Sequence, residues 1–378
     1  MRIGVVTFWW GQDNYGQIAQ CYALQSVLRR MGHEPFIVRC RPQSTLKSRL
    51  AQFFRMLQSP HARERRKSWN AVVRPGTRRF REFLEERCAF SAETFDSFAA
   101  LKENCPEADA FIVGSDQVWN CNADANGRIW FLDFVPAGSK KIAYAASFGK
   151  IRAYAAFKAF CREKLESFDA VGVREQEGAD FLKSLGVEAT LVADPTLLLS
   201  RGAYDALAGT PSSENESFAF CYWLGRHDPE DVLPVAEVAE FLSGRGLPLK
   251  SVVGGVPFPT EGLGEIGSPT FPQWLASIRD AEVVFTNSFH GTVFCLIFRK
   301  PMVVFPSRSG IGNGRLRSLL SLCGLESRIY ARGENPVERI LSQKINWENV
   351  GERLREHVRL SEEFLNRSLG KCSCSCKK

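Results

Sequence analysis

Short apolar runs alternate with helical patterns along nearly the whole chain, and this alternation constrains the fold more than any other feature of the sequence. Such alternation is typical of strand–helix–strand units whose strands form a parallel sheet. In the first half of the chain, the apolar runs predict strands at residues 3–8, 35–39, 110–113, 141–146, 170–173 and 189–192. In the second half, they predict strands at residues 217–224, 249–253, 282–286 and 302–305. The sequence therefore predicts an α/β protein with two Rossmann-like parallel-sheet domains.

A stretch rich in Pro, Gly and Ser near residue 200 separates the two halves, as linkers between domains often do. We expect one domain over residues 1–199 and a second, smaller domain over residues 200–345. Apolar side chains recur at helical spacing over residues 347–368, which predicts a closing helix in a last segment, 346–378, that ends in a Cys-rich tail. Two such sheets face a cleft, and open α/β sheets bind ligands at the carboxyl ends of their strands. The loops after the strands are therefore the candidate sites.

The composition fits a soluble protein of two domains. The chain has 378 residues, 44% of them apolar and 24% charged, and a domain typically has about 150 residues. No apolar run reaches the roughly 18 residues of a membrane helix, and the N-terminal run is too short for a signal peptide. Nine of the twelve cysteines lie scattered through the chain and are expected to be reduced. We therefore expect a cytoplasmic protein.

Positive charge is concentrated in one segment. The net charge of the chain is +7, and residues 39–87 alone hold fourteen Lys and Arg against four Glu. Aromatic and leucine side chains lie among these arginines, a mixture found in amphipathic helices at anionic membrane surfaces. We expect a basic helical insertion at about residues 41–87, either simply solvated or in peripheral contact with an anionic membrane. No zinc finger, basic zipper or aromatic RNA-binding motif accompanies it, so we expect no nucleic acid partner.

The loops after strands 3–8 and 110–113 each carry polar residues. Residues 11–16 connect the first strand to a helix, whose free backbone amides can bind an anion, but the glycine spacing fits neither a dinucleotide fingerprint nor a P-loop. Asp116 follows the other strand, where a carboxylate can act as an acid, as a base or as an acceptor for a sugar hydroxyl. A plain glycine turn and an aspartate that caps the next turn are the structural alternatives.

Arginines follow two further strands. Arg174 comes directly after strand 170–173 and can hold a phosphate or carboxylate with two parallel hydrogen bonds. A structural ion pair with a neighbouring glutamate is the alternative. Arg308 and Arg315 lie on the glycine-rich loop after strand 302–305, where they can enclose an anion or merely solvate the surface.

His290 lies where strand 282–286 meets a helix that Thr286 or Ser288 would cap. The dipole at a helix N-terminus favours a bound anion, so the imidazole could bind a ligand oxyanion or donate a proton to it. A histidine satisfied within the core is the alternative.

Short polar and aromatic motifs recur in and around these loops. They are Asn14-Tyr15-Gly16, Gln20-Cys-Tyr-Ala-Leu24, Gly114-Ser-Asp-Gln-Val-Trp-Asn120, Ser147-Phe-Gly149, Val173-Arg-Glu175 with Gly186, Asp194-Pro-Thr196, Thr286-Asn-Ser-Phe-His-Gly-Thr292 and Lys300-Pro301. In this order the motifs resemble those of the polysaccharide pyruvyl transferase family. The resemblance extends from residue 1 to about 330 and leaves out residues 41–87 and the cysteine tail.

The resemblance implies a fold similar to the two-domain (GT-B-like) glycosyltransferases. It also implies an enzyme that transfers the pyruvyl group of phosphoenolpyruvate to sugar hydroxyls of a glycan, often lipid-linked, with formation of a ketal and release of phosphate. Arg174 and His290 match the donor-binding arginine and histidine of the family. The third cationic position is displaced in this chain, so Arg308 or Arg315 would have to replace it. No cofactor and no metal are implied.

The hypothesis from the resemblance and the loops assigns a role to each candidate residue. The expected catalytic residues are His290, Arg174 and Asp116; the donor-binding residues are Arg174, Ser288, His290, Gly291, Arg308 and Arg315; and the acceptor-binding residues are Asn14, Tyr15, Gly16, Asp116, Gln117 and Trp119. A lipid-linked acceptor would place the enzyme at the inner membrane face, in contact through residues 41–87. The alternatives are a glycosyltransferase that uses a nucleotide sugar and a noncatalytic glycan-binding relative.

Overall fold

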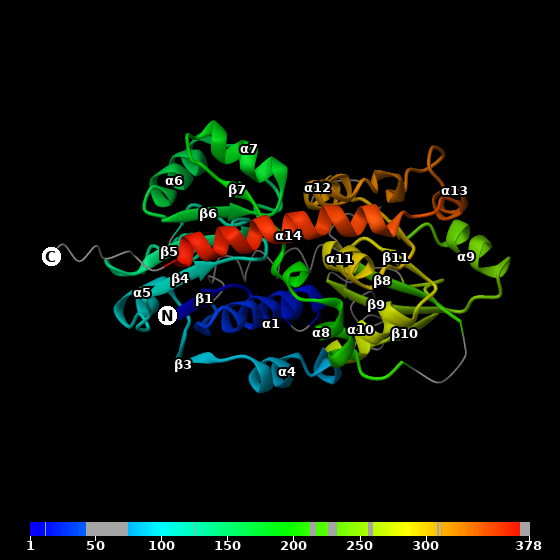
Figure 1. The fold of residues 1–378 in the computed structure, drawn as a ribbon, viewed down its shortest axis with the longest axis horizontal. Coiled ribbons are helices and arrows are strands. Elements are labelled where there is room, and N and C mark those ends of the chain that lie inside the picture. Colours follow the sequence, from blue (N-terminus) through cyan, green and yellow to red (C-terminus); the bar gives the residue numbers. More distant parts are fainter. Residues whose placement is uncertain are drawn as a thin grey trace, which may run out of the picture.

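The protein folds into two α/β domains, each built on a parallel sheet (Figure 1). The computed structural model describes residues 1–11, 13–42, 75–124, 126–211, 217–225, 233–255, 260–307, 310 and 312–370. None of the helices in these ranges combines the length and the apolar character needed to span a bilayer. The nine cysteines within the ranges are free thiols, and seven of them are buried. The cysteine tail and residues 43–74 of the predicted basic insertion lie outside the described residues.

The N-terminal sheet has the strand order β3-β2-β1-β4-β5-β6-β7, and every neighbouring pair is parallel. Its strands are β1 (Arg2–Val6), β2 (Glu34–Cys40), β3 (Phe90–Phe95), β4 (Ala110–Val113), β5 (Lys140–Ala146), β6 (Ala170–Val173) and β7 (Thr190–Leu191). Six coincide with apolar runs of the sequence. The edge strand β3 was not predicted, because three consecutive residues in its middle are exposed and polar or small and so form no apolar run.

The helices of the first domain are α1 (Tyr15–Arg30), α4 (Phe80–Arg87), α5 (Phe98–Glu103), α6 (Ala155–Leu165) and α7 (Gln176–Ser184). The next helix, α8 (Arg201–Ala208), packs against α10 (Phe271–Asp280) of the second domain. The helix α1 begins where Asn14 accepts a hydrogen bond from the Gly16 amide, and it buries an almost continuous apolar face.

The C-terminal sheet has the order β10-β9-β8-β11-β12 and is also parallel throughout. Its strands are β8 (Ala219–Gly225), β9 (Leu249–Gly255), β10 (Glu265–Gly267), β11 (Val283–Thr286) and β12 (Met302–Val304). Its helices are α9 (Val235–Ser243), α10 (Phe271–Asp280), α11 (Phe289–Phe298), α12 (Asn313–Cys323) and α13 (Val337–Ser342). The short edge strand β10 carries no apolar run and was not predicted.

The last helix, α14 (Trp347–Leu369), crosses both domains, as the red ribbon in Figure 1 shows. Near its start, the Arg353 guanidinium donates to the Leu322 carbonyl at the end of α12. Further along, the Ser361 hydroxyl accepts a hydrogen bond of 2.8 Å from the backbone amide of Ala193, which follows β7. The helix therefore joins the C-terminal domain to the edge of the N-terminal sheet.

One apolar core continues from the first domain into the second. At the junction, the Tyr15 ring stacks on Trp274 of α10 with 5.0 Å between ring centroids, and the Tyr15 hydroxyl donates to the Pro269 carbonyl at 2.6 Å. Arg78, which precedes α4, is fully buried and donates to the Asp13 carbonyl at 2.9 Å and to the Val253 carbonyl of β9 at 2.5 Å. These contacts set how the two sheets face each other.

Candidate functional site

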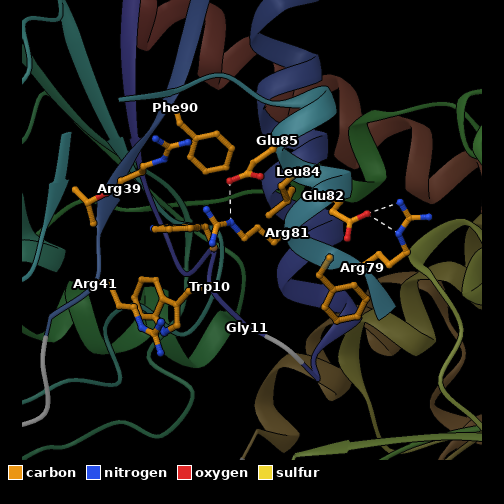
Figure 2. Close-up of a pocket in the computed structure, with 13 residues that line it drawn as sticks. Trp10, Gly11, Arg39, Arg41, Arg79, Arg81, Glu82, Leu84, Glu85 and Phe90 are labelled. Carbon is orange, nitrogen blue, oxygen red and sulfur yellow. Dashed lines mark hydrogen bonds and ion pairs between the residues drawn. The ribbon is translucent and has the colours of Figure 1, made fainter. Parts of the chain in front are cut away.

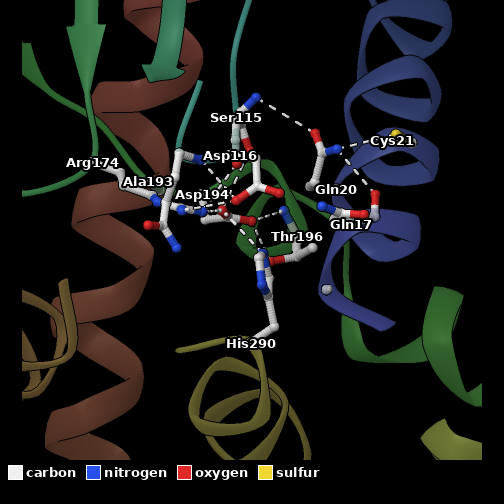
Figure 3. A network of polar contacts seen from close by, with 12 residues as sticks. Gln17, Gln20, Cys21, Ser115, Asp116, Arg174, Ala193, Asp194, Thr196 and His290 are labelled. Carbon is white, nitrogen blue, oxygen red and sulfur yellow. Dashed lines mark hydrogen bonds and ion pairs between the residues drawn. The ribbon is translucent and has the colours of Figure 1, made fainter. Parts of the chain in front are cut away.

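Two of the predicted site residues, Arg174 and His290, meet at a buried carboxylate, Asp194, which follows β7 (Figure 3). The Arg174 Nη1, directly after β6, donates to Asp194 Oδ2 at 2.7 Å. The His290 Nε2, in the first turn of α11, lies 3.4 Å from the same oxygen. Arg174 belongs to the first domain and His290 to the second, so the site spans the domain junction.

Local sequence places each of these side chains. Asp194 caps a short 3₁₀ helix that begins at Pro195, and its Oδ1 accepts from the Thr196 amide at 3.1 Å and from the Thr196 hydroxyl at 2.6 Å. Ser288 caps α11 by accepting from the Gly291 amide, which places His290 within the first turn of that helix. These two capping interactions therefore hold the Asp194 carboxylate and the His290 imidazole in place before a ligand binds.

The charged groups of the site interact strongly because they are buried. Asp194, Arg174 and His290 are at most 5% exposed. Burial raises the pKa of the Asp194 carboxyl, but the interactions with His290, Arg174 and the Thr196 hydroxyl outweigh it and hold the pKa below its usual range. Asp194 is therefore ionised and keeps a cationic guanidinium at the junction, where it can face an anionic ligand.

Asp116, in the loop after β4, lies at the edge of this cluster. Its Oδ1 accepts from the Gln117 amide at 2.7 Å and lies 3.7 Å from Arg174 Nη2, and its side chain is nearly buried. Within the described part of the chain, neither Arg174 Nη2 nor Nε has a hydrogen-bond partner. These buried N–H groups allow Arg174 to donate hydrogen bonds to a further, anionic partner.

Arg315, the first arginine of α12, approaches the same cluster. With the Gln117 amide oriented so that its oxygen faces the guanidinium, this oxygen accepts from Arg315 Nη2 at 2.7 Å and from Nη1 at 3.2 Å. The Phe289 ring lies beneath both cations, with its centroid 4.6 Å from Arg174 Cζ and 5.7 Å from Arg315 Cζ. Arg308, the other predicted cation of this region, lies outside the described residues.

Glu175 is a third buried carboxyl at this site, after Asp194 and Asp116, and the sequence suggested it only as an ion-pair partner for Arg174. Its Oε1 accepts from the Phe148 amide at 2.8 Å, and its Oε2 has no hydrogen-bond partner among the described residues. Burial raises the pKa of the Glu175 carboxyl, although Arg174 and Arg315 oppose the shift. A buried acid with a raised pKa is a group that can take part in proton transfer.

Of the predicted acceptor residues, Asn14 and Gly16 contribute to the start of α1 beside the site, whereas the rings of Tyr15 and Trp119 are buried. Asn14 caps α1, and Gly16 lies against the His290 ring. Tyr15 and Trp119 are fully buried, and the Trp119 indole donates to the Trp130 carbonyl at 2.9 Å, so neither ring is presented to a ligand in this structure.

The predicted donor residues Ser288 and Gly291 act on the backbone of the α11 N-terminus. The Ser288 hydroxyl is engaged as the helix cap. A Cβ on Gly291 would lie 2.5 Å from Thr286 Oγ1, so the close approach of the helix to β11 requires glycine here.

Gly16→Ala is expected to lower the free energy of unfolding by about 1–3 kcal/mol, because the new Cβ would lie 2.1 Å from the buried His290 Nδ1 and force the ring to move. Urea unfolding measures the change. Gly202→Ala in α8 is the matched control, since its Cβ would meet only Ser200 Oγ at 3.9 Å, and it should leave stability unchanged or slightly raised. Equal effects of the two substitutions would contradict the close packing of α1 on His290.

Asp194 is the central residue of the site, but reasoning from single loops did not select it. The sequence does contain a signal, because Asp before Pro and Thr is a typical start of a helical turn. That signal predicts a cap, and only the folded chain shows that the other oxygen of the carboxylate contacts Arg174 and His290. Within the described ranges, no group of three or more His, Cys, Asp or Glu side chains is arranged to hold a metal ion.

Comparison with known proteins identifies both the fold and the family. No curated protein matches the sequence. Among solved structures, the UDP-GlcNAc 2-epimerase of Methanocaldococcus jannaschii in complex with UDP-GlcNAc and UDP is similar, with a TM-score of 0.54, 12% identity, and coverage of 96% of this chain and 100% of that chain. The S. aureus MnaA–UDP structure is similar with a TM-score of 0.50, 11% identity, and coverage of 97% and 96%.

At such identities the likeness shows the fold alone, and it confirms the predicted pair of parallel-sheet domains of the GT-B-like type. The family model for polysaccharide pyruvyl transferase matches residues 14–309. The match includes Arg174, Asp194 and His290, the residues that meet at the domain junction. The matched sequence thus places this chain in the polysaccharide pyruvyl transferase family.

Proposed function

We propose that this protein transfers the pyruvyl group of phosphoenolpyruvate to two hydroxyls of a glycan, with formation of a ketal and release of phosphate. The observation that carries the proposal is the meeting of Arg174 and His290, from different domains, at the buried Asp194. A donor with a phosphate and a carboxylate needs cations that are fixed in place before it binds. Membership of the pyruvyl transferase family supports the same reaction.

The proposed roles follow the chemistry of the groups. Arg174 and His290 hold the phosphate and carboxylate of the donor, and Arg315 supplies the third cation. Its position beside Gln117 and Phe289 supports this choice. Asp116 receives protons from the acceptor hydroxyls, since its carboxylate lies 3.7 Å from Arg174 Nη2.

The setting of the reaction also remains a proposal. A lipid-linked acceptor would be met at the cytoplasmic face of the membrane, with the basic segment 41–87 in peripheral contact. Most of that segment, residues 43–74, lies outside the described residues. The cytoplasmic location and the membrane contact therefore stay predictions from the sequence.

A second candidate function is glycosyl transfer from a nucleotide sugar. It is favoured by the two structural neighbours described above, both of which were solved with UDP. Thermal-shift titrations with phosphoenolpyruvate, inorganic phosphate and UDP distinguish the candidates. Stabilisation by phosphoenolpyruvate beyond that by phosphate supports pyruvyl transfer, and stabilisation by UDP alone supports the alternative. A noncatalytic relative would bind glycan but release no phosphate from phosphoenolpyruvate.

His290→Ala is expected to weaken phosphoenolpyruvate binding about 10- to 150-fold, because a hydrogen bond to a charged group contributes about 1.5–3 kcal/mol. The apparent Kd from the thermal-shift titration measures it. His33→Ala is the matched control, since His33 precedes β2 and thus lies at the amino end of the sheet, away from the site. An affinity within twofold of wild type in His290→Ala would exclude the proposed donor contact.

A further inference from the structure

A separate cavity of about 500 Å³ lies beside the loop between β1 and α1 (Figure 2). Its walls come from this loop, from β2 and β3, and from α4. None of Asp116, Arg174, Asp194 and His290 lines it. We call this cavity the Arg39 pocket; the residues that define it are Trp9, Trp10, Phe90, Arg39, Arg41 and Arg81.

Two arginines of the Arg39 pocket have no acidic partner among the described residues. Arg81 pairs with Glu85 at 2.8 Å, and Arg79 pairs with Glu82. No such ion pair forms at Arg39 or Arg41, which are two residues apart at the end of β2 and therefore face the same side of the sheet. The pocket thus carries a net positive charge that suits a phosphate or a carboxylate.

Another part of the wall of the Arg39 pocket is aromatic. Trp9 contacts Phe90 at 5.5 Å between ring centroids, and it contacts Trp10 at 6.1 Å. Arg39 lies against the Phe90 ring (Figure 2), with its Cζ 4.8 Å from the ring centroid. Flat aromatic surfaces beside hydrogen-bond donors are the surfaces on which the C–H faces of sugar rings pack.

One polar group in the pocket wall also lacks a partner. Among the described residues, the buried Trp9 indole Nε1 has no hydrogen-bond partner. A buried donor without an acceptor is unfavourable, so a ligand oxygen that reached it would be favoured. The volume of the cavity is in the range of pockets that hold small ligands.

We propose that the Arg39 pocket binds a negatively charged segment of the glycan acceptor, with a sugar ring on the tryptophans and a phosphate or carboxylate on Arg39 and Arg41. This inference rests on the proposed function. Gly11 lines the pocket, and Gly16, five residues further along, lies against His290. The chain between them spans at most about 18 Å, which an acceptor of several sugar units can bridge. The pocket holds one part of the acceptor while another part reaches the donor.

Isothermal titration calorimetry of the full chain tests the proposal with four probes: a hexose 1-phosphate, a hexuronic acid, the neutral hexose and inorganic phosphate. We expect the hexose 1-phosphate or the hexuronic acid to bind more tightly than both the neutral hexose and phosphate. Which of the two charged sugars binds more tightly shows whether the pocket selects phosphate or carboxylate.

The double variant Arg39→Ala/Arg41→Ala is expected to weaken binding of the charged sugar at least tenfold. Arg355→Ala on the exposed face of α14 removes an arginine elsewhere and should leave the affinity unchanged. Trp10→Ala should weaken the sugar probes and leave phosphate binding as it is. The single variant Arg41→Ala, at an exposed position, provides the same test if the double variant fails to fold.

Unchanged binding of the charged sugar in the folded Arg39→Ala/Arg41→Ala or Arg41→Ala protein would overturn the proposal. Inorganic phosphate binding as tightly as the hexose 1-phosphate would also overturn it, because the pocket would then be a simple anion site. The thermal shift with phosphoenolpyruvate reports on the donor site separately and should persist in these variants. If wild type shows no such shift but the pocket variants lose sugar binding, the proposed donor fails and the glycan pocket stands.

Discussion

Asp194→Asn is expected to lower the free energy of unfolding by about 3–5 kcal/mol and to abolish donor binding. The substitution keeps the size of the side chain and removes its charge. Arg174 would remain buried without its close ion pair, since the Asp116 carboxylate lies 3.7 Å from its Nη2 and the Ser115 carbonyl that accepts from its Nη1 is uncharged. Removal of one member of a buried ion pair is strongly destabilising, because the other charge loses its compensation. Urea unfolding and the thermal shift with phosphoenolpyruvate measure the two effects.

Asp205→Asn is the matched control. Asp205 pairs with Arg201 at 3.3 Å on the surface, where both side chains are more than one-third exposed. Exposed ion pairs contribute little, so this substitution should leave the urea midpoint nearly unchanged. Equal midpoints for Asp194→Asn and wild type would show that Asp194 does not hold Arg174 and His290 in the way the structure indicates.

The contribution of the Asp194 charge to the stability of the fold depends on pH. Its pKa in the folded protein is held below the usual value of 3.8, so its charge stabilises the fold above about pH 4. This contribution is lost progressively as the pH falls below 4 toward the folded pKa. The difference in stability between wild type and Asp194→Asn should therefore be largest near neutral pH and shrink on acidification. A difference that grows on acidification would contradict this assignment.

Arg78→Ala is expected to lower the free energy of unfolding by a similar amount, about 3–5 kcal/mol. The change removes two hydrogen bonds from a charged donor, to Asp13 in the first domain and to Val253 in the second. It also removes the guanidinium that lies 5.1 Å from the centroid of the Tyr15 ring and leaves a cavity at the domain junction. Because Arg174 and His290 belong to different domains, we expect weaker donor binding as well.

Arg79→Ala, at the next position, is the control for Arg78. The Arg79 side chain is 62% exposed and pairs with Glu82 on the surface, so its loss should not shift the urea midpoint. Both variants remove one arginine from the same basic segment. An equally small change of the urea midpoint in both variants would contradict a stabilising role for the buried hydrogen bonds of Arg78.

The comparison of these neighbours shows how far a charge pattern predicts a role. From the sequence, Arg78 is one of fourteen basic residues between 39 and 87, a segment expected to be solvated or to contact a membrane. In the structure Arg78 is fully buried between the domains, while Arg79 is exposed. Charge density along the chain does not report burial, because burial depends on which distant backbone packs against a given side chain.

The apolar runs of the sequence were enough to predict most of the strands, their parallel arrangement and the two-domain class. These properties follow from apolar runs a few residues long, which must be covered on both faces of a parallel sheet. The edge strands β3 and β10 escaped prediction, because an edge strand can expose polar side chains and then carries no apolar run. The loops with reactive residues were also visible, since Asp116, Arg174 and His290 each follow a strand.

Which of these residues meet depends on the folding of the whole chain. Arg174 and Asp194 are 20 residues apart in the chain, and Asp194 and His290 are separated further still, yet both cations reach one carboxylate oxygen. Tertiary packing likewise buried Tyr15 and Trp119, which the sequence offered as ligand contacts. Local patterns act over one helix turn or one strand, whereas a site at a domain junction depends on how two sheets are docked by contacts such as those of Arg78.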